Sequence, residues 1–202
     1  DLSRDGVSCI KVLGKMQMVA SGYYNGCVII WDTMFGDYRK FYHDQNTGIY
    51  QIVFDSERKL IFTCGFDHDI YVYDPFIDGY SIHRLEGHKY SINSIACNEK
   101  LNEFISIDIY GNIKVWDTLN NFNFQTINLN ETVNTQNNKK LSSNQKMILL
   151  KKVNKIFTYG EKLMMFNKET FNLPDLTDNQ SILGCIYRDT KYKLIAVCIK
   201  KN

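Results

Sequence analysis

The amino-acid sequence predicts an all-β protein built from a repeated unit of four short strands. A phrase of about twelve residues occurs three times, at 21–32, 63–74 and 106–117. Each copy ends on an aromatic residue followed by Asp, and these aromatics (Trp31, Tyr73 and Trp116) lie 42 and 43 residues apart. A hydroxyl side chain stands ten residues before each aromatic, at Ser21, Thr63 and Ser106. A period near 40–45 residues predicts the four-stranded blades of a β-propeller.

The strands of the first three units follow from alternating hydrophobicity and turn residues. In the first unit, Asn25-Gly26 predicts a hairpin, because both residue types tolerate a positive φ. In the second, Asp74-Pro75 begins a loop, because proline cannot donate to a following strand. The predicted strands are 7–13, 16–21, 26–31 and 38–42 in the first unit, 49–54, 60–64, 70–73 and 81–85 in the second, and 92–97, 104–107, 113–116 and 123–127 in the third.

A polar stretch then interrupts the pattern. Residues 128–146 are rich in Asn, Thr, Gln, Ser and Lys, which predicts a loop or a disordered insertion. The strand rhythm resumes at 147–150, 155–159 and 162–166, with Phe166 in the aromatic place, and again at 182–187 and 194–199. We therefore expect blades at 1–43, 44–86, 87–127 and 128–178, and a partial fifth at 179–202. About four blades do not close a typical ring, so we expect a segment of a larger propeller.

Composition narrows the possible functions. Lys and Arg number 24 against 22 Asp and Glu, a formal net charge of +2 that gives no argument for nucleic-acid binding. The six cysteines lie in apolar strand-like runs without a CxxC pair, which indicates reduced core residues and a cytosolic-type compartment. No apolar run approaches the ~20 residues of a membrane span. We expect no membrane, metal, cofactor or small-molecule substrate.

The chain resembles WD40-repeat proteins, most clearly at Gly87-His88 and Trp116-Asp117. In that family a buried network joins the Gly-His histidine, a strand Ser or Thr, a turn Asp and the Trp. The resemblance implies that Tyr110 stands where the acid belongs in blade 3, which leaves the network incomplete. The implied structural residues are His88, Ser106, Trp116 and Asp117 in blade 3, Ser21, Trp31 and Asp32 in blade 1, and Thr63, Asp67, Tyr73 and Asp74 in blade 2.

A narrower resemblance rests on 71–76, 85–92, 98–100 and 185–187. These segments look like the EF-hand-containing WD-repeat proteins of cilia and flagella. That family implies a structural part of the axoneme. The EF-hand loop pattern itself is absent from the sequence, so calcium binding is not implied.

No catalytic constellation stands out in the sequence. Repetition of Asp32, Asp74 and Asp117 after strands indicates acceptors that stabilise turns, not catalytic acids. Aromatic residues at the predicted hairpin turns and the loops before inner strands are candidate partner-binding anchors: Tyr23, Tyr24, Tyr50, Phe66, Tyr90 and Tyr110. The loops at 33–38, 75–80 and 118–121 are further candidate contacts.

The predicted function is therefore a non-enzymatic scaffold for protein–protein interaction. One hypothesis is a structural component of a ciliary, axonemal or cytoskeletal assembly, cytoplasmic or in the axoneme, with tubulin or axonemal proteins as partners. The alternative is an adaptor subunit of another complex, in ubiquitin ligation, trafficking or ribonucleoprotein assembly. Flanking EF-hands or a second propeller would favour the first hypothesis, and an F-box, a coiled coil or an RNA-binding module the second.

Overall fold

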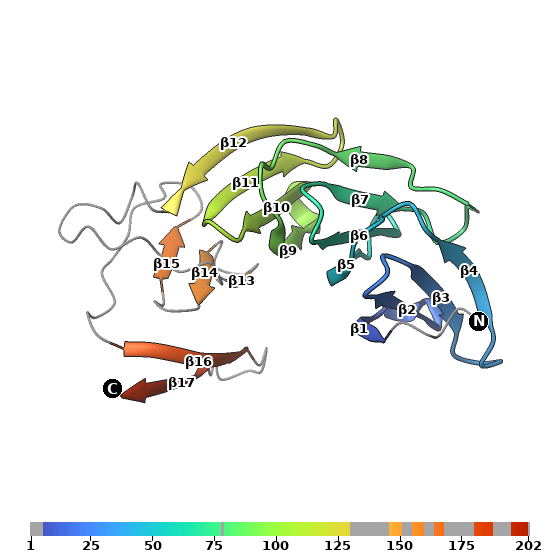
Figure 1. The fold of residues 1–202 in the computed structure, drawn as a ribbon, viewed down its shortest axis with the longest axis horizontal. Helices are drawn as coiled ribbons and strands as arrows, with labels where there is room; N and C mark the ends of the chain where they lie inside the picture. Colours follow the sequence, from blue (N-terminus) through green and yellow to red (C-terminus); the bar gives the residue numbers. More distant parts are fainter. Residues whose placement is uncertain are drawn as a thin grey trace.

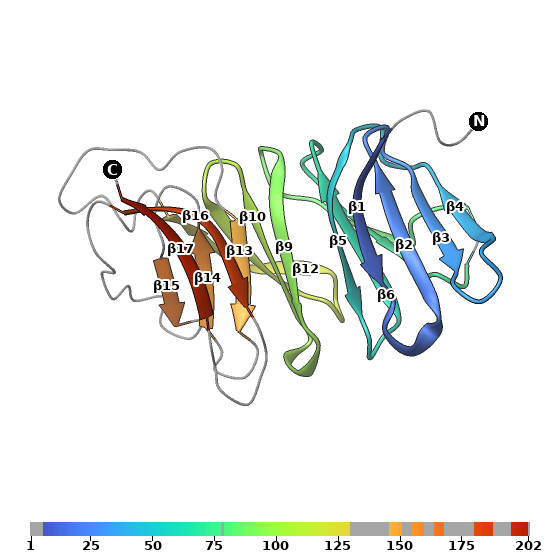
Figure 2. The same cartoon turned by 90° about the horizontal axis from the view of Figure 1, so that it is seen from below.

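Successive antiparallel sheets make up the protein. The computed structural model describes residues 6–77, 79–129, 146–150, 155–159, 164–167, 180–187 and 195–201. Its first four sheets follow one another round an arc, as the ribbon in Figure 1 shows. Seen from below, the strands of neighbouring sheets stand side by side (Figure 2). The chain is thus an all-β protein whose sheets are arranged as a partial propeller.

Each of the first three sheets has four strands in simple chain order. The first contains β1 (Val7–Val12), β2 (Met18–Tyr23), β3 (Val28–Asp32) and β4 (Tyr38–Tyr42). The second contains β5 (Ile49–Asp55), β6 (Leu60–Gly65), β7 (Ile70–Tyr73) and β8 (His83–Leu85). The third contains β9 (Ile92–Asn98), β10 (Glu103–Asp108), β11 (Asn112–Asp117) and β12 (Phe122–Asn128). Single turns of 3-10 helix precede β2 (Gly14–Met16) and β10 (Glu99–Leu101).

Two smaller sheets follow along the chain. The fourth pairs β13 (Lys146–Leu150), β14 (Lys155–Tyr159) and β15 (Met164–Asn167), and the fifth pairs β16 (Gln180–Tyr187) with β17 (Ile195–Lys201). Of the predicted insertion 128–146, both ends belong to ordered structure, because Asn128 ends β12, Leu129 is buried and Lys146 begins β13. Residues 130–145 lie outside the described residues.

The aromatic residues of the repeated phrase occupy the same place in successive sheets. Trp31, Tyr73, Trp116 and Phe166 each lie on the third strand, opposite the second residue of the strand before it. Tyr73 and Trp116 are fully buried and Trp31 is half-buried. The spacing of 42 and 43 residues therefore reflects one residue position repeated from sheet to sheet.

The hydrophobic core lies between sheets as well as within them. The first two sheets share a cluster that includes Leu13, Ile30, Tyr42, Ile61 and Tyr73. The second and third share another, in which the rings of Phe62 and Phe104 stack with centroids 4.4 Å apart. A third cluster joins the third sheet to Met147 and Ile156 of the fourth. The first four sheets thus bury apolar side chains against their neighbours along the chain, as expected for repeat architectures.

Inner strands bring the sheets together along the concave side of the arc. β1, β5, β9 and β13 contact one another in that order, whereas β4, β8 and β12 lie on the outer side (Figure 1). Gln51 of β5 accepts hydrogen bonds at Oε1 from Ser94 Oγ (3.0 Å) and the Ile95 amide (2.8 Å) of β9. Hydrogen bonds therefore cross the boundary between blades 2 and 3, in addition to apolar packing.

Further ties join blades 2 and 3 at both ends of these strands. At one end, Ser91 Oγ donates to the Phe66 carbonyl (2.7 Å). At the other end, Ser56 Oγ donates to the Glu99 carboxylate (3.0 Å). At the same end Arg58 pairs with the fully buried Asp55 of its own blade (3.0 Å) and donates to side chains of Asn102 and Thr118 in blade 3.

The two ends of the strands form two rims. We call the β2–β3, β6–β7 and β10–β11 turns, with the loops before β5 and β9, the hairpin rim. The opposite rim carries the β3–β4, β7–β8 and β11–β12 loops. At the hairpin rim Gly26 has φ +88°, and a Cβ there would lie 1.7 Å from the Gln45 carbonyl oxygen, so only glycine fits. The expected Asn-Gly turn thus also allows blade 2 to approach blade 1 closely.

Candidate interaction surface

A buried hydrogen-bond network lies directly behind the hairpin rim in blade 3. Trp116 Nε1 donates to Ser106 Oγ (2.8 Å), and Ser106 Oγ lies 2.7 Å from His88 Nε2. His88 Nδ1 lies 3.3 Å from Asp108 Oδ2. The Asp108 carboxylate can only accept, so Nδ1 of a neutral imidazole carries the proton and donates to Asp108. His88 Nε2 then accepts from the Ser106 hydroxyl, whose oxygen accepts the indole N–H. The chain of donors therefore runs from Trp116 to Asp108 without a break.

The expectation that blade 3 lacks its acid was wrong. Asp108 supplies the carboxylate, and Tyr110, two residues later, is exposed on the rim. Asp108 and Ser106 lie two residues apart on β10, and in a strand residues i and i+2 point to the same face. Asp108 Oδ1 also accepts the Tyr110 and Asn112 amides, both at 2.9 Å, and Asn112 Nδ2 donates to Oδ2 at 2.8 Å.

The environment of the network sets its protonation. Burial lowers the pKa of His88, and the opposing effect of the Asp108 carboxylate does not reverse this. Burial alone would raise the pKa of Asp108, but hydrogen bonds from His88 and Asn112 outweigh burial and bring it below its ordinary value. The stable arrangement is a neutral imidazole beside a carboxylate that four hydrogen-bond donors satisfy.

Blade 2 uses different residues at the same positions. Thr63 Oγ1 donates to Gln45 Oε1 (3.1 Å), so Gln45 takes the histidine place, and Gly65 stands where blade 3 has Asp108. Tyr73 fills the Trp place. The expected place of Asp67 in this network was wrong: its carboxylate instead accepts the Tyr71 hydroxyl (2.7 Å) and the His68 amide (2.8 Å).

In blade 1, Tyr23 lies beside the buried Ser21 and not at the surface. Trp31 Nε1 donates to Ser21 Oγ (2.7 Å), and the Tyr23 hydroxyl lies 3.5 Å from the same oxygen. Tyr23 is only 5% exposed and packs with Cys27 and Ile29. The prediction that Tyr23 is an exposed anchor was therefore wrong: it occupies the position of Asp108, two residues after the hydroxyl and on the same face of the strand.

The strand-terminal aspartates hold the loops of the opposite rim. Asp32 Oδ1 accepts the Met34 amide (2.7 Å), Asp74 Oδ1 the Phe76 amide (2.8 Å) and Asp117 Oδ1 the Leu119 amide (2.7 Å). Each Asp thus caps its own turn two residues on. Six apolar side chains in these loops are at least half exposed: Met34, Phe35, Phe76, Ile77, Tyr80 and Leu119.

The five remaining predicted anchors form what we call the aromatic row along the hairpin rim. Its members are Tyr24, Tyr50, Phe66, Tyr90 and Tyr110. Tyr50 is half-buried, and the other four are between 42% and 61% exposed. The Tyr50 and Phe66 rings lie 4.5 Å apart, and the Tyr90 and Tyr110 rings 4.2 Å apart. Gly48 lies against both Tyr24 and Phe66, and Ser91 beside Tyr90 binds the Phe66 carbonyl, so the row crosses three blades.

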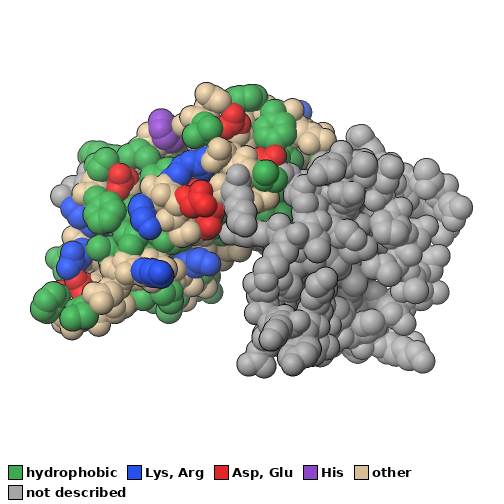
Figure 3. All heavy atoms as spheres, turned by 180° about the vertical axis from the view of Figure 1, so that it is seen from behind, with side chains coloured by type: hydrophobic (Ala, Val, Ile, Leu, Met, Phe, Trp, Pro, Cys, Tyr) green, Lys and Arg blue, Asp and Glu red, His purple; other side chains and the backbone are tan. Residues whose placement is uncertain are grey.

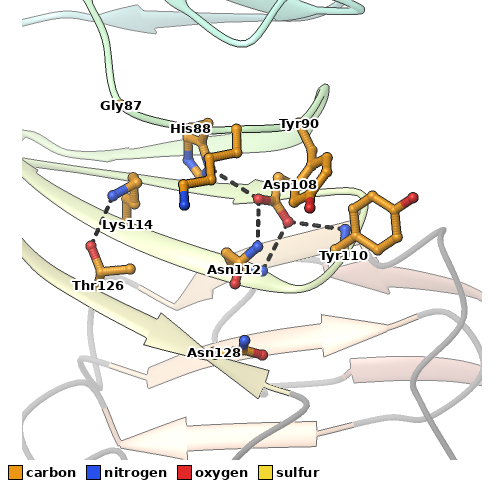
Figure 4. A pocket seen from close by; sticks show the side chains of 10 residues that line it. Gly87, His88, Tyr90, Asp108, Tyr110, Asn112, Lys114, Thr126 and Asn128 are labelled. Atoms are coloured by element: carbon orange, nitrogen blue, oxygen red, sulfur yellow. Dashed lines mark hydrogen bonds and ion pairs between the residues drawn. The ribbon is translucent and has the colours of Figure 1, made fainter.

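A pocket opens at the blade 3 end of the aromatic row. Its volume is about 530 Å³, and it is drawn in Figure 4. Tyr90 and Tyr110 stand on one side, Lys114 and Thr126 on the other, and His88, Asp108 and Asn112 lie between them. Gly87, Lys89 and Asn128 complete the lining. Sequence patterns missed Lys114, although its place on β11, two residues before Trp116, put it on the same face as the indole.

On the face of the described residues that Figure 3 shows, hydrophobic side chains do not gather into one large patch. Seen from behind, hydrophobic side chains form separate groups between charged ones (Figure 3). Within the described part of the chain, no group of three or more His, Cys, Asp or Glu side chains is placed to hold a metal ion. Cys9, Cys27, Cys64 and Cys97, the cysteines whose side chains are described, form no disulfide. In the same residues no helix is long and apolar enough to cross a membrane.

Comparison with known proteins defines the class. Residues 3–32, 37–74 and 79–117 match the family model described as WD domain, G-beta repeat. These matches cover more than half of the chain, which therefore belongs to the WD40-repeat family. The second match contains β4 to β7 and the third contains β8 to β11, so both contain the outer strand of one sheet and three strands of the next. WD40 repeats mediate protein–protein interaction, and the chain is accordingly a protein-interaction scaffold.

Individual relatives are distant. The chain is 27% identical over 173 residues to cilia- and flagella-associated protein 337 B of Tetrahymena thermophila, an alignment that covers 86% of this chain. It is 22% identical over 126 residues to nuclear distribution protein nudF 1 of Talaromyces marneffei, and 24% identical over 117 residues to nuclear distribution protein nudF of Aspergillus niger. These alignments cover 61% and 56% of this chain. The chain spans 13% of the Tetrahymena protein and 28% and 26% of the two fungal proteins.

Proposed function

We propose that this chain is a structural component of a ciliary or other cytoskeletal assembly that holds partner proteins against the hairpin rim. The aromatic row carries the binding part of this proposal. Paired rings restrict each other before a partner arrives, so they lose little rotamer freedom on binding. Tyrosine is also among the residues that dominate interface energy, and exposed aromatics at a rigid rim suit that role.

The ciliary part of the proposal is supported by the name of the Tetrahymena relative, which is described as cilia- and flagella-associated. We accordingly propose axonemal proteins or tubulin as partners, and the cytoplasm or the axoneme as the location. The alternative is an adaptor in another multiprotein complex, which the likeness to two nuclear distribution proteins favours.

Co-sedimentation of the full-length protein with isolated axonemes tests the proposal. We expect Tyr24→Ala combined with Phe66→Ala to abolish most of the binding, because both rings are exposed in the described structure. The matched control, Phe35→Ala with Tyr80→Ala, removes two aromatic rings from the opposite rim and should leave binding intact. A second control neutralises Lys151 and Lys152, which lie outside the described residues.

Two results would overturn the proposal. Loss of binding only in the Phe35/Tyr80 variant would place the interface on the opposite rim. Loss only in the Lys151/Lys152 variant would show a purely electrostatic attachment. Binding of the protein to cytoplasmic complexes, with none to axonemes, would favour the adaptor alternative.

A further inference from the structure

The pocket beside the aromatic row is lined by more positive than negative side chains. Two lysines line it, Lys89 from the loop before β9 and Lys114 from β11. One carboxylate, that of Asp108, lies at its base, but its oxygens already accept four hydrogen bonds within the blade. The two ammonium groups are therefore the charged groups available to bind an incoming side chain.

Lys114 is held in position before any ligand arrives. Its Nζ donates to Thr126 Oγ1 (2.9 Å) and lies 3.5 Å from Asn123 Oδ1 on β12. It also lies 6.0 Å from the centre of the Trp116 ring. Because an ammonium group has three N–H donors and two are engaged here, one remains to meet a ligand. Figure 4 shows the Lys114–Thr126 pair across the pocket from the two tyrosines.

Electrostatics agree with this geometry. Burial lowers the pKa of Lys114; the neighbouring Lys89 charge also lowers it, and the Asp108 carboxylate opposes them. Two like charges near each other are stabilised by an anion between them. The pocket thus offers two cations, the amide of Asn112 and two tyrosine rings within about 530 Å³, which is enough space for side chains of an extended segment.

We propose that this pocket receives a carboxylate side chain from an extended, glutamate-rich segment of the partner protein, with Lys89 and Lys114 as the charge partners. The Tyr90 and Tyr110 rings pack against the residues on either side of that glutamate. This proposal rests on the proposed function, since it names the chemistry of the partner at one end of the aromatic row. Charge complementarity favours an acidic segment over a neutral or basic one.

Fluorescence anisotropy with a defined probe tests the proposal. The probe is a fluorescein-labelled peptide of alternating Glu and Gly, and the comparison peptide has Gln in place of every Glu. The full-length protein should bind the Glu peptide and not the Gln peptide. Lys114→Gln should weaken binding roughly tenfold, the factor expected when one charge-assisted hydrogen bond is lost.

Matched variants distinguish loss of the Lys114 charge from a general effect of substitution on folding. Lys114→Arg keeps the charge and should restore most of the binding, and Lys89→Gln changes an exposed side chain and should also weaken it. The control, Lys11→Gln with Lys15→Gln, removes positive charge from blade 1 and should leave affinity unchanged. Equal affinity for the Glu and Gln peptides, or an equal loss in the Lys11/Lys15 control, would overturn the proposal.

This result is separable from the test of the proposed function. Failure of the peptide to bind, together with axoneme binding that still depends on Tyr24 and Phe66, removes the acidic pocket alone. Peptide binding that depends on Lys114, in a protein that does not sediment with axonemes, removes the ciliary assignment alone.

Discussion

The same substitution at equivalent positions of two blades should have different costs. Ser106→Ala removes the oxygen that accepts Trp116 Nε1–H and donates to His88 Nε2. Both partners are buried, with Trp116 1% and His88 6% exposed, so neither can bond to water instead. A buried polar group left without a partner costs about 1–3 kcal/mol. Two such groups give a loss of about 2–6 kcal/mol in the free energy of unfolding.

Ser21→Ala is the internal comparison. Ser21 Oγ accepts Trp31 Nε1–H at 2.7 Å, but Trp31 is half-buried and water can replace the lost acceptor. The expected loss is about 1 kcal/mol, the net value of an ordinary hydrogen bond.

Urea unfolding followed by tryptophan fluorescence measures both, since the two tryptophans of the chain are Trp31 and Trp116. At a slope of about 2 kcal/mol/M, Ser106→Ala should lower the midpoint by about 1–3 M. An equal or larger effect of Ser21→Ala would refute the argument that burial of the partners sets the cost.

Three further predictions concern the same framework. Because burial holds the pKa of His88 below its ordinary 6.5, neutral His88 contributes stability that is complete above about pH 6.5 and is lost as pH falls through the lowered pKa. In urea unfolding at a series of pH values, His88→Gln should flatten this part of the dependence of stability on pH. The loss that begins below about pH 3.8 and continues as pH falls through the lowered pKa of Asp108 should persist, because the Asn112 hydrogen bonds to Asp108 remain. Arg58→Ala leaves the fully buried Asp55 without its cation, and calorimetry should show a loss of about 3–5 kcal/mol that the added change Asp55→Asn partly restores. Asp117→Ala removes the acceptor for the Leu119 and Asn120 amides, so it should speed hydrogen exchange in this loop, while binding to axonemes stays the same.

Much of the architecture could be read from the sequence because each blade repeats the same constraints. Alternation and turn residues located every strand of the first three sheets to within a few residues. The repeated aromatic positions also proved to be structurally equivalent. These features depend on local periodicity, which a single sequence displays directly.

The errors share one cause. The acid of blade 3 was expected in the turn, four residues after Ser106, because spacing within the family's phrase was used instead of the face of the strand. Asp108 and Tyr23 each lie two residues after the hydroxyl residue of their blade, and both therefore point inward beside it. The alternation of side chains along a strand would have predicted both positions. Lys114 was missed because its hydrogen bond to Thr126 and the nearby charge of Lys89, which distinguish it from an ordinary surface lysine, depend on the tertiary structure.

The hydrogen bonds and ring contacts between blades 2 and 3 limit how far these blades can move relative to each other. They lie at both ends of the inner strands and between them, at Ser91, Gln51 and Ser56, and the Phe62–Phe104 stack adds contact farther out. Sliding or twisting of one blade against the other would have to break several of them together. We therefore expect these contacts to hold the loops that carry Phe66 and Tyr90 at a constant separation. If partners bind at the aromatic row, we expect one whose side chains match that distance to bind both sites without ordering the platform first, and one that is too long or too short to bind more weakly.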